Sequence, residues 1–351
     1  MTADAAEPEP ASTPSTAATG DDAPPVRFGL IGVGVIGRLH AQRLLSGAAP
    51  ATLVALADHV PAHARLVAQE YGVEAAGSTA ELLRRDDMEA VVIAVPSGLH
   101  AEMAVAALEA GKHVLLEKPI EVTVAGAERI LEAEQRSGQV LSVVSQHRFA
   151  SATRWLKAAI DEGALGRITS ATIDIPWWRS QGYYDSAPWR GTWELDGGGA
   201  LMNQGVHMVD VALWLLGQAE EVFAHTGRLA HDGIEVEDAL TATAQLRSGA
   251  LLTIRATTAA YGDMPLRFTI SGDAASIALE DDQVVDFRSR DGIPLPELPT
   301  LDVQLEQLRD MVSAIRTGTP PLVTGAEARD AVAFIEAAYA SARTGAPTRP
   351  A

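Results

Sequence analysis

Two charged side chains follow the apolar stretch HVLL in the segment HVLLEKPI, residues 113–120. A parallel strand buried under helices cannot easily hold charge along its length, but its carboxyl end opens into the crevice where α/β proteins bind ligands. Glu117 and Lys118 therefore stand where a role toward a ligand is expected. The residues alone leave open a second interpretation, a salt-bridged turn that Pro119 closes.

A glycine-rich segment, GVGVIG, lies between an apolar stretch, VRFGLI, and a helical pattern. Its spacing matches G-x-G-x-x-G, the dinucleotide-binding fingerprint, in the setting that the fingerprint requires. Gly32 would permit the tight turn, Gly34 would let the backbone approach a pyrophosphate, and Gly37 would let helix and strand pack closely. Val35 and Ile36 lie between them and are predicted to line the cofactor site, where the helix N-terminus offers free N–H groups to phosphates.

An acid, Asp58, ends the next apolar stretch, TLVALAD, about 20 residues beyond the last glycine of the motif. A carboxylate there accepts hydrogen bonds from the adenosine ribose and repels a 2′-phosphate, and no Lys or Arg follows directly. NAD is therefore the predicted cofactor, and NADP is less favoured. Pro96 follows the strand expected at 90–95 and is predicted on the same cofactor side. The alternative is that the glycines only form a tight turn and that Asp58 is a surface acid.

The elements that must position these residues alternate regularly. Strand and helix units continue to a strand expected at 140–145, and this spacing predicts a parallel, doubly wound sheet. Residues 220–290 hold alternating strands with hairpin-length turns, which predict an antiparallel sheet, and Gly345 is expected to stop a final helix. The predicted fold class is α/β, with an N-terminal Rossmann doubly wound parallel sheet and a C-terminal α/β domain with an open, mainly antiparallel sheet.

Composition narrows the function classes. The 351 residues include 27 Lys and Arg against 46 Asp and Glu, a net charge of −19, without a basic block, so neither nucleic acid nor an anionic membrane is an expected partner. The absence of cysteine excludes a disulfide framework, a thiolate metal site and a cysteine nucleophile. No His, Asp and Glu grouping has metal-ligand spacing, so no metal is predicted.

The predicted division of the chain has three parts. Residues 1–25, rich in acids, Ala, Pro, Ser and Thr, are expected to form a disordered tail and lack the pattern of a secretory signal. Residues 26–147 form the predicted NAD-binding domain and residues 148–345 the second domain. No apolar run approaches the ~20 residues that cross a bilayer, so a cytoplasmic protein is expected.

With these motifs in place, the chain resembles the Gfo/Idh/MocA oxidoreductase family, named for glucose–fructose oxidoreductase, inositol dehydrogenase and a rhizopine-catabolism protein. The likeness covers about residues 26–345 and includes GVGVIG, AGKHVLLEKP, the pair Arg148 and Phe149, and GGGALMNQGVHMVD. The resemblance implies a second domain whose open sheet carries substrate contacts and often subunit contacts, hence a homodimer or homotetramer. It also implies that Lys118 lies beside the nicotinamide and touches the hydroxyl to be oxidised, with Glu117 orienting this lysine or its turn.

The segment LDGGGALMNQGVHMVD supplies the other half of the expected site. Asn203 and His207 stand four residues apart and hence on one helix face, and His207 is the natural general base. A histidine satisfied within the core is the alternative. Inositol dehydrogenase-like members have Asp where this chain has Asn203, so the amide could orient His207 without giving it full charge. Asp210 could supply that charge instead, or make a packing contact.

An aromatic cluster between these landmarks could stack on the apolar faces of a sugar, with arginines binding hydroxyls or a carboxylate. It could equally form an interdomain or subunit core. The cluster and its arginines are Trp177, Trp178, Arg179, Tyr183, Tyr184, Trp189, Arg190 and Trp193. Of these, Tyr184, Trp189 and Arg190 are predicted substrate contacts, together with Arg148, Lys118, Asn203 and His207.

The predicted function is an NAD-dependent dehydrogenase that oxidises a secondary hydroxyl of a sugar, cyclitol or sugar derivative to a ketone by direct hydride transfer. Lys118, His207 and Asn203 are the predicted catalytic residues. Two alternatives from other classes remain: a glycosidase of the same fold that uses NAD transiently, and a nucleotide-binding regulator without turnover. The partner predicted in every catalytic case is a small polyol or sugar.

Overall fold

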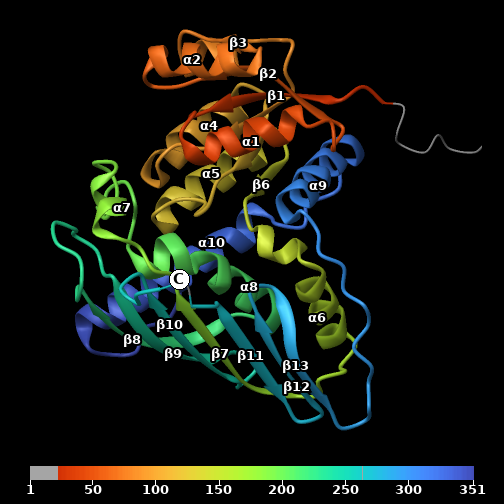
Figure 1. The fold of residues 1–351 in the computed structure, drawn as a ribbon, viewed down its shortest axis with the longest axis vertical. Coiled ribbons are helices and arrows are strands. Elements are labelled where there is room, and N and C mark those ends of the chain that lie inside the picture. Colours follow the sequence, from red (N-terminus) through yellow and green to blue (C-terminus); the bar gives the residue numbers. More distant parts are fainter. Residues whose placement is uncertain (1–22, 263) are drawn as a thin grey trace, which may run out of the picture.

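The computed structural model describes residues 23–262 and 264–351 and contains two β-sheets (Figure 1). Residues 1–22 of the predicted tail lie outside the described residues. The two sheets lie at opposite ends of the molecule in Figure 1, with α8 (Val206–Leu216) and α10 (Gly325–Thr344) between them. No helix of the described residues is long and apolar enough to cross a membrane.

The first sheet is parallel throughout, in the order β3-β2-β1-β4-β5-β6. The strand order reverses between β1 and β4, where α/β sheets open a ligand crevice at the strands' carboxyl ends. The strands are β1 (Val26–Ile31), β2 (Ala51–Ala57), β3 (Glu74–Ala75), β4 (Ala90–Ile93), β5 (His113–Leu116) and β6 (Leu141–Val143). Their helices are α1 (Val35–Leu45), α2 (Pro61–Tyr71), α3 (Thr79–Leu83), the 3-10 turn η1 (Ser97–Leu99), α4 (His100–Glu109) and α5 (Val124–Ser137).

The second sheet has the order β13-β12-β11-β7-β10-β9-β8 and is antiparallel except where β10 pairs in parallel with β7. Buried and exposed residues alternate along β9 and β10, so one face packs on helices and the other is open. Its strands are β7 (Ile168–Pro176), β8 (Ala219–Gly227), β9 (Ala239–Leu246), β10 (Leu251–Thr257), β11 (Arg267–Gly272), β12 (Ala275–Glu280) and β13 (Gln283–Ser289). The predicted fold class is thereby confirmed.

The remaining helical elements follow β6 in the chain. They are η2 (Gln146–Phe149), α6 (Ser151–Asp161), α7 (Gln181–Asp185), the π-helical turn η3 (Ala200–Gly205), α8, α9 (Val303–Thr317) and α10. Of these, η2 and α6 connect the first sheet to the second. Gly345 ends α10 in the left-handed conformation, as expected from its position. The predicted regular helix after the triple glycine instead begins with the wider π-helical turn η3.

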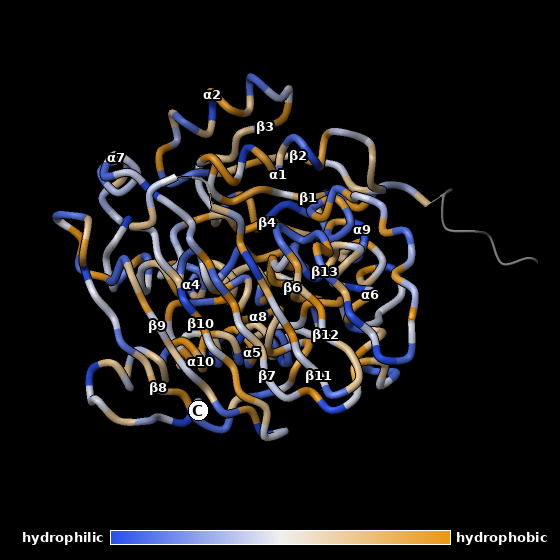
Figure 2. Tube along the Cα trace, turned by 60° about the horizontal axis from the view of Figure 1, so that its bottom comes forward, coloured by the Kyte–Doolittle hydropathy of each residue, from blue (hydrophilic) through white to orange (hydrophobic). Residues whose placement is uncertain are grey.

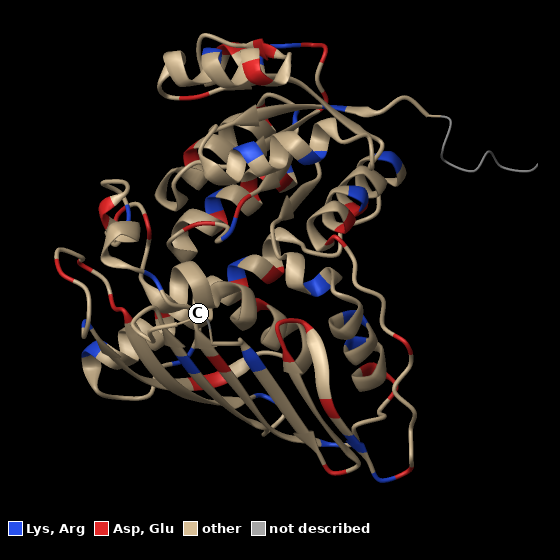
Figure 3. Ribbon diagram, viewed as in Figure 1, with Lys and Arg blue, Asp and Glu red and all other residues tan. Residues whose placement is uncertain are grey.

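Buried apolar residues form a core that is continuous from the first sheet to the second, including Ile93, Ile130, Phe268 and Phe334. Figure 2 shows hydrophobic residues following α10 and the neighbouring strands, and Figure 3 shows acidic and basic residues interspersed along the chain. Helix α9 belongs to the stretch assigned to the second domain, yet its Leu308, Met311 and Val312 pack with strands of the first sheet. The C-terminal part of the chain therefore returns to cover the N-terminal sheet.

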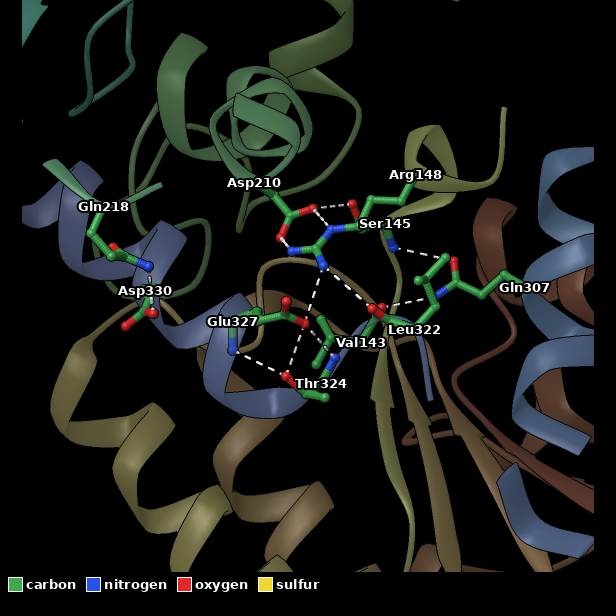
Figure 4. Close-up of polar contacts among 10 residues, drawn as sticks. All are labelled: Val143, Ser145, Arg148, Asp210, Gln218, Gln307, Leu322, Thr324, Glu327 and Asp330. Carbon is green, nitrogen blue, oxygen red and sulfur yellow. Dashed lines mark hydrogen bonds and ion pairs between the residues drawn. The ribbon is translucent and has the colours of Figure 1, made fainter. Parts of the chain in front are cut away.

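A buried ion pair clasps η2 to α8 (Figure 4). The Arg148 guanidinium donates Nε and Nη2 to the two carboxylate oxygens of Asp210 at 2.7 and 2.6 Å, and Ser145 adds a short hydrogen bond to the same carboxylate. Nη1 of Arg148 contacts Glu327 at 3.1 Å and the carbonyl of Leu322 at 3.3 Å. With 1% exposure, Arg148 is bound within the protein, so the structure does not present this predicted substrate contact to a ligand.

The same clasp decides between the two roles considered for Asp210. Its carboxylate is occupied by Arg148 and Ser145, so Asp210 makes a packing contact and does not supply charge to His207. Because α8 carries both Asp210 and His207, the ion pair between Arg148 and Asp210 also fixes the position of His207 relative to η2.

Asp210→Asn is expected to lower the free energy of unfolding by ~3–5 kcal/mol, because it leaves a buried guanidinium without its bidentate partner. Urea unfolding followed by circular dichroism measures the loss. The matched control is Asp174→Asn, which removes the exposed bidentate pair with Arg255 and should cost less than about 1 kcal/mol. Equal losses in the two variants would show that the clasp carries no special stability.

Candidate active site

The glycine turn between β1 and α1 has the geometry that a dinucleotide site needs. Gly32 has φ +90°, and a Cβ there would lie 2.5 Å from the carbonyl oxygen of Ala94. A Cβ on Gly37 would lie 2.0 Å from the carbonyl oxygen of Gly32, so this position requires glycine for packing. Gly34 differs, because no protein atom lies within 4 Å of where its Cβ would be.

The open space at Gly34 continues over the first turn of α1. Val35 is 74% exposed and Ile36 is 44% exposed, which leaves two apolar side chains and the free N–H groups of a helix N-terminus uncovered. A pyrophosphate-bearing cofactor would cover these groups and use the dipole of α1. The residues present therefore fit the predicted dinucleotide.

Asp58 directly follows β2 and closes one end of this turn. Its carboxylate accepts the N–H of Val33 at 3.0 Å and the N–H of Val60 at 2.9 Å. A carboxylate has about four acceptor sites, so it can still accept from a ribose hydroxyl. Asp58, the residue predicted to bind the ribose, is thus held in place by the glycine turn itself.

Glu117 and Lys118 extend the end of β5 toward the same edge. The Glu117 carboxylate contacts His40 Nε2 of α1 at 2.8 Å and accepts the N–H of Lys118 at 3.1 Å. Burial opposes the charged form of Glu117, but the hydrogen bond and charge of His40, with the charge of Lys118, hold its pKa below the usual value. Glu117 thus connects the end of β5 to α1. The peptide bond between Lys118 and Pro119 is cis.

The Lys118 ammonium crosses to the second half of the chain. Its Nζ donates to the backbone carbonyl of Asn203 at 2.8 Å and to Oδ1 of the same residue at 3.2 Å. The Asn203 amide nitrogen donates in turn to the carboxylate of Asp196, which is 1% exposed. Asn203 therefore connects a buried carboxylate to the lysine.

This carboxylate was missed by reasoning from the sequence. Asp196 directly precedes the triple glycine, and its other oxygen accepts the N–H of Gly191 at 2.8 Å. The signal that could have found it is the acid in LDGGG, seven residues before Asn203. Burial lowers the pKa of Lys118 below its usual 10.5, and Arg179 and Arg190 lower it further, while the charges of Glu117 and Asp196 oppose the shift.

His207 lies one helical turn beyond Asn203 and lines a small cavity together with Lys118, Pro119 and Ser145. His207 is 7% exposed, and its Nδ1 is enclosed without a hydrogen-bond partner among the described residues, whereas Nε2 remains open. Burial, with Lys118 and His147 nearby, lowers the pKa of His207 well below 6.5. The imidazole is therefore neutral near pH 7 and can accept a proton.

A second histidine, also missed from the sequence, packs against the first. The rings of His147 and His207 lie 5.3 Å apart between centroids in an edge-to-face arrangement, and His147 Nδ1 contacts Asp282 at 2.6 Å. His147 directly precedes Arg148, so the clasp between η2 and α8 also sets this ring pair.

The aromatic segment divides into inward and cleft-facing parts. Tyr184 is 5% exposed and its hydroxyl pairs with Thr258 at 2.9 Å; burial raises its pKa to about 12. The structure thus places Tyr184 in the core rather than in the cleft. Tyr183 is half-buried, with the guanidinium carbons of Arg179 and Arg190 at 4.9 and 4.1 Å from its ring centroid.

Trp189 lies beneath Arg190, with 4.6 Å from the guanidinium carbon to the ring centroid. Pro96 directly precedes η1, the turn after β4, and Gly98 of that turn donates to the carbonyl of Leu195 at 3.0 Å. The structure therefore brings together most predicted site residues along one edge of the first sheet, leaving Arg148 and Tyr184 in the interior.

Comparison with known proteins supports this arrangement. Residues 26–145 match the family described as oxidoreductase family, NAD-binding Rossmann fold, and residues 153–278 match the GFO/IDH/MocA C-terminal domain. The myo-inositol 2-dehydrogenase of Thermotoga maritima is 29% identical over 326 residues, covering 88% of this chain and 93% of that protein. The levoglucosan dehydrogenase of Pseudarthrobacter phenanthrenivorans is 30% identical over 285 residues, covering 72% and 73%.

A solved structure is similar over nearly its whole length. The WlbA dehydrogenase from Bordetella pertussis, in complex with NADH and UDP-GlcNAcA, superposes with a TM-score of 0.85 at 33% identity, covering 93% of this chain and 98% of that one. The first domain is thus an NAD-binding Rossmann domain, and the predicted cofactor NAD is confirmed.

Gly34→Ala is expected to separate cofactor binding from folding. At φ −65° an alanine is unstrained and meets no protein atom, so the melting temperature should stay within about 2 °C of the wild type, while a methyl group in the phosphate path should weaken NADH binding about tenfold or more. Fluorescence titration with NADH measures the binding. Gly37→Ala is the matched comparison and should destabilise the fold itself. Unchanged NADH affinity in Gly34→Ala would contradict the prediction that the cofactor phosphates bind at this turn.

Proposed function

The chain belongs to the Gfo/Idh/MocA oxidoreductase family, and from this premise we propose that it oxidises a secondary hydroxyl of a sugar, cyclitol or sugar derivative to a ketone by direct hydride transfer. Relatives named as inositol, glucoside and levoglucosan dehydrogenases support this substrate class. The proposed substrate is a small carbohydrate.

One observation carries the proposal: Lys118 and His207, which come from different parts of the chain, border one small cavity, and the Lys118 ammonium binds Asn203 one helical turn before His207. Lys118 directly follows the segment that extends β5 of the first sheet, and His207 lies on α8, whose buried residues share one core with the second sheet. Oxidation of an alcohol needs a cation to polarise the oxygen and a base to take its proton. The pair supplies both groups at one place.

The proposed roles follow from the state of each group. Lys118 donates to the hydroxyl oxygen and stabilises the negative charge that develops there. His207, kept neutral by its environment, accepts the hydroxyl proton at Nε2, the ring nitrogen that remains open. Asn203 holds the lysine in position through its carbonyl and side-chain oxygens. Bound NAD supplies the hydride acceptor.

Lys118→Ala is expected to lower kcat by about 10²–10⁴ with NADH affinity close to the wild type, because the variant loses the polarising cation but keeps the glycine turn. Steady-state NADH formation and NADH fluorescence titration measure the two effects. Lys157→Ala, which removes a lysine paired with Asp161 on α6, is the matched control. A parallel loss of NADH binding in Lys118→Ala would assign the lysine to the cofactor instead.

The wild-type reaction itself separates the two alternative functions. A dehydrogenase accumulates NADH in proportion to substrate consumed, whereas a glycosidase that uses NAD transiently releases sugar without net NADH. A regulator without turnover does neither. Screening sugars, inositols, sugar acids and glycosides with NAD, with both NADH absorbance and released sugar measured, distinguishes all three.

The pH profile of kcat/KM tests His207 as the base. Its folded pKa is depressed, so the active neutral form persists as pH falls below 6.5, and the acidic limb should have its midpoint below that value. His207→Ala should lower kcat about 10²–10⁴-fold and abolish this limb, while His63→Ala, an exposed histidine on α2, leaves the profile unchanged. An acidic limb that persists in His207→Ala would assign the base to another group.

A further inference from the structure

Two arginines enclose one tyrosine beside the proposed active site. The guanidinium carbons of Arg179 and Arg190 lie 4.9 and 4.1 Å from the ring centroid of Tyr183. The guanidinium carbon of Arg179 also lies 5.4 Å from the ring centroid of Trp177, and that of Arg190 lies 4.6 Å from the ring centroid of Trp189. Aromatic faces hold planar guanidinium groups without using their N–H donors, so the donors at the edges stay available.

A continuous set of contacts connects this arginine pair to the lysine. The Tyr183 hydroxyl contacts the side-chain amide of Gln204 at 3.5 Å, and the same amide contacts Oδ1 of Asn203 at 3.4 Å. Oδ1 of Asn203 accepts the Lys118 ammonium at 3.2 Å. These contacts, and the lowering of the Lys118 pKa by both arginines, place the pair beside the proposed active site rather than at a remote surface.

The absence of acidic partners distinguishes these two arginines. Every other arginine that is partly or fully buried within residues 23–262 and 264–351 forms an ion pair with Asp or Glu, as Arg148 does with Asp210. Arg179 and Arg190 form none with any described residue, although acids outnumber bases in the chain. Asp196, the nearby carboxylate, is already bound to Gly191 and Asn203.

Several donors of the pair are free. Each Nε is enclosed and has no partner among the described residues. Only one terminal nitrogen, Nη1 of Arg179, makes a hydrogen bond, at 3.3 Å to the carbonyl of Trp178, and the others are neither enclosed nor bonded in the described chain. Half-buried guanidinium groups with unused donors are costly unless a ligand completes them.

The backbone holds the pair rigidly. The N–H of Arg179 donates to Thr258 at 2.9 Å, and its carbonyl contacts His231 at 2.8 Å. The residue after Arg190, Gly191, donates to Asp196 at 2.8 Å. The same Asp196 anchors Asn203, so one buried carboxylate sets both the lysine and Arg190. Such preorganisation is what a binding subsite needs.

We propose that Arg179 and Arg190 form a carboxylate-binding subsite and that the substrate is therefore a sugar acid, whose carbinol meets Lys118 and His207 while its carboxylate meets the two guanidinium groups. This inference rests on the proposed function and names the substrate class within it. Planar guanidinium edges match a planar carboxylate. A local cationic site also offsets the repulsion that a chain of charge −19 exerts on an anionic substrate.

Binding to the enzyme–NADH complex tests the subsite without turnover. Isothermal titration compares glucuronate and galacturonate with glucose and galactose, which differ from them only at the carboxylate. The acids should bind at least tenfold more tightly than the neutral sugars. Arg190→Gln and Arg179→Gln should each weaken binding of the acids about 10–100-fold, the range for a lost hydrogen bond to a charged group.

Two further variants control for charge and geometry. Arg190→Lys keeps the charge but loses the flat two-nitrogen edge, so it should recover only part of the affinity for the acids. Arg288→Gln removes an arginine that pairs with Asp286 on β13 and should leave the affinity unchanged.

The outcomes separate the two hypotheses. Neutral sugars that bind and turn over as well as the acids would overturn the subsite and leave the dehydrogenase function intact. Glucose 6-phosphate binding more tightly than the acids, with the same arginine dependence, would overturn the carboxylate assignment. Arginine-dependent binding of the acids without NADH formation from any sugar would support the subsite and overturn the proposed function.

Discussion

The site depends on one interaction, the ammonium of Lys118 held by the two oxygens of Asn203. A lysine at a strand end is flexible and strongly hydrated, so it polarises a substrate only if something fixes it and partly removes its water. The carbonyl of Asn203 is available for this because the chain passes through the π-helical turn η3. Asp196 behind the amide supplies the counter-charge that lets the ammonium exist in a half-buried place.

Such a contact is useful only if the two halves of the chain cannot drift apart. The Arg148–Asp210 clasp, the continuous apolar core and the return of α9 to the first sheet all span the same junction. Glu237 fixes the glycine entry to η3, since its carboxylate accepts the N–H groups of Gly199 and Leu201 at 2.9 Å each and the Tyr339 hydroxyl at 2.9 Å. Glu237 therefore stabilises the turn that carries Asn203, the hydrogen-bond partner of Lys118.

The sequence predicted what depends on local order. Apolar runs and glycine spacing located the parallel sheet, its carboxyl edge and the residues Gly32, Asp58 and Lys118 that follow strand ends. The sequence could not predict contacts between residues far apart in the chain. Arg148, an expected substrate contact, instead forms a buried ion pair with Asp210, 62 residues away. The sequence left open whether Asp210 supplies charge to His207, whereas the carboxylate that acts on Lys118, Asp196, lies in the loop before η3.

The charges of the site form one coupled set. Lys118 lowers the pKa of His207, so by reciprocity a proton on His207 would make the lysine easier to deprotonate, and the two groups cannot both hold a positive charge at low cost. Arg179 and Arg190 add to this positive field. An anion bound to the arginines cancels their contribution and favours the ammonium of Lys118 at the moment of substrate binding. Charge recognition at one end of a substrate thereby sets the protonation state needed at the other.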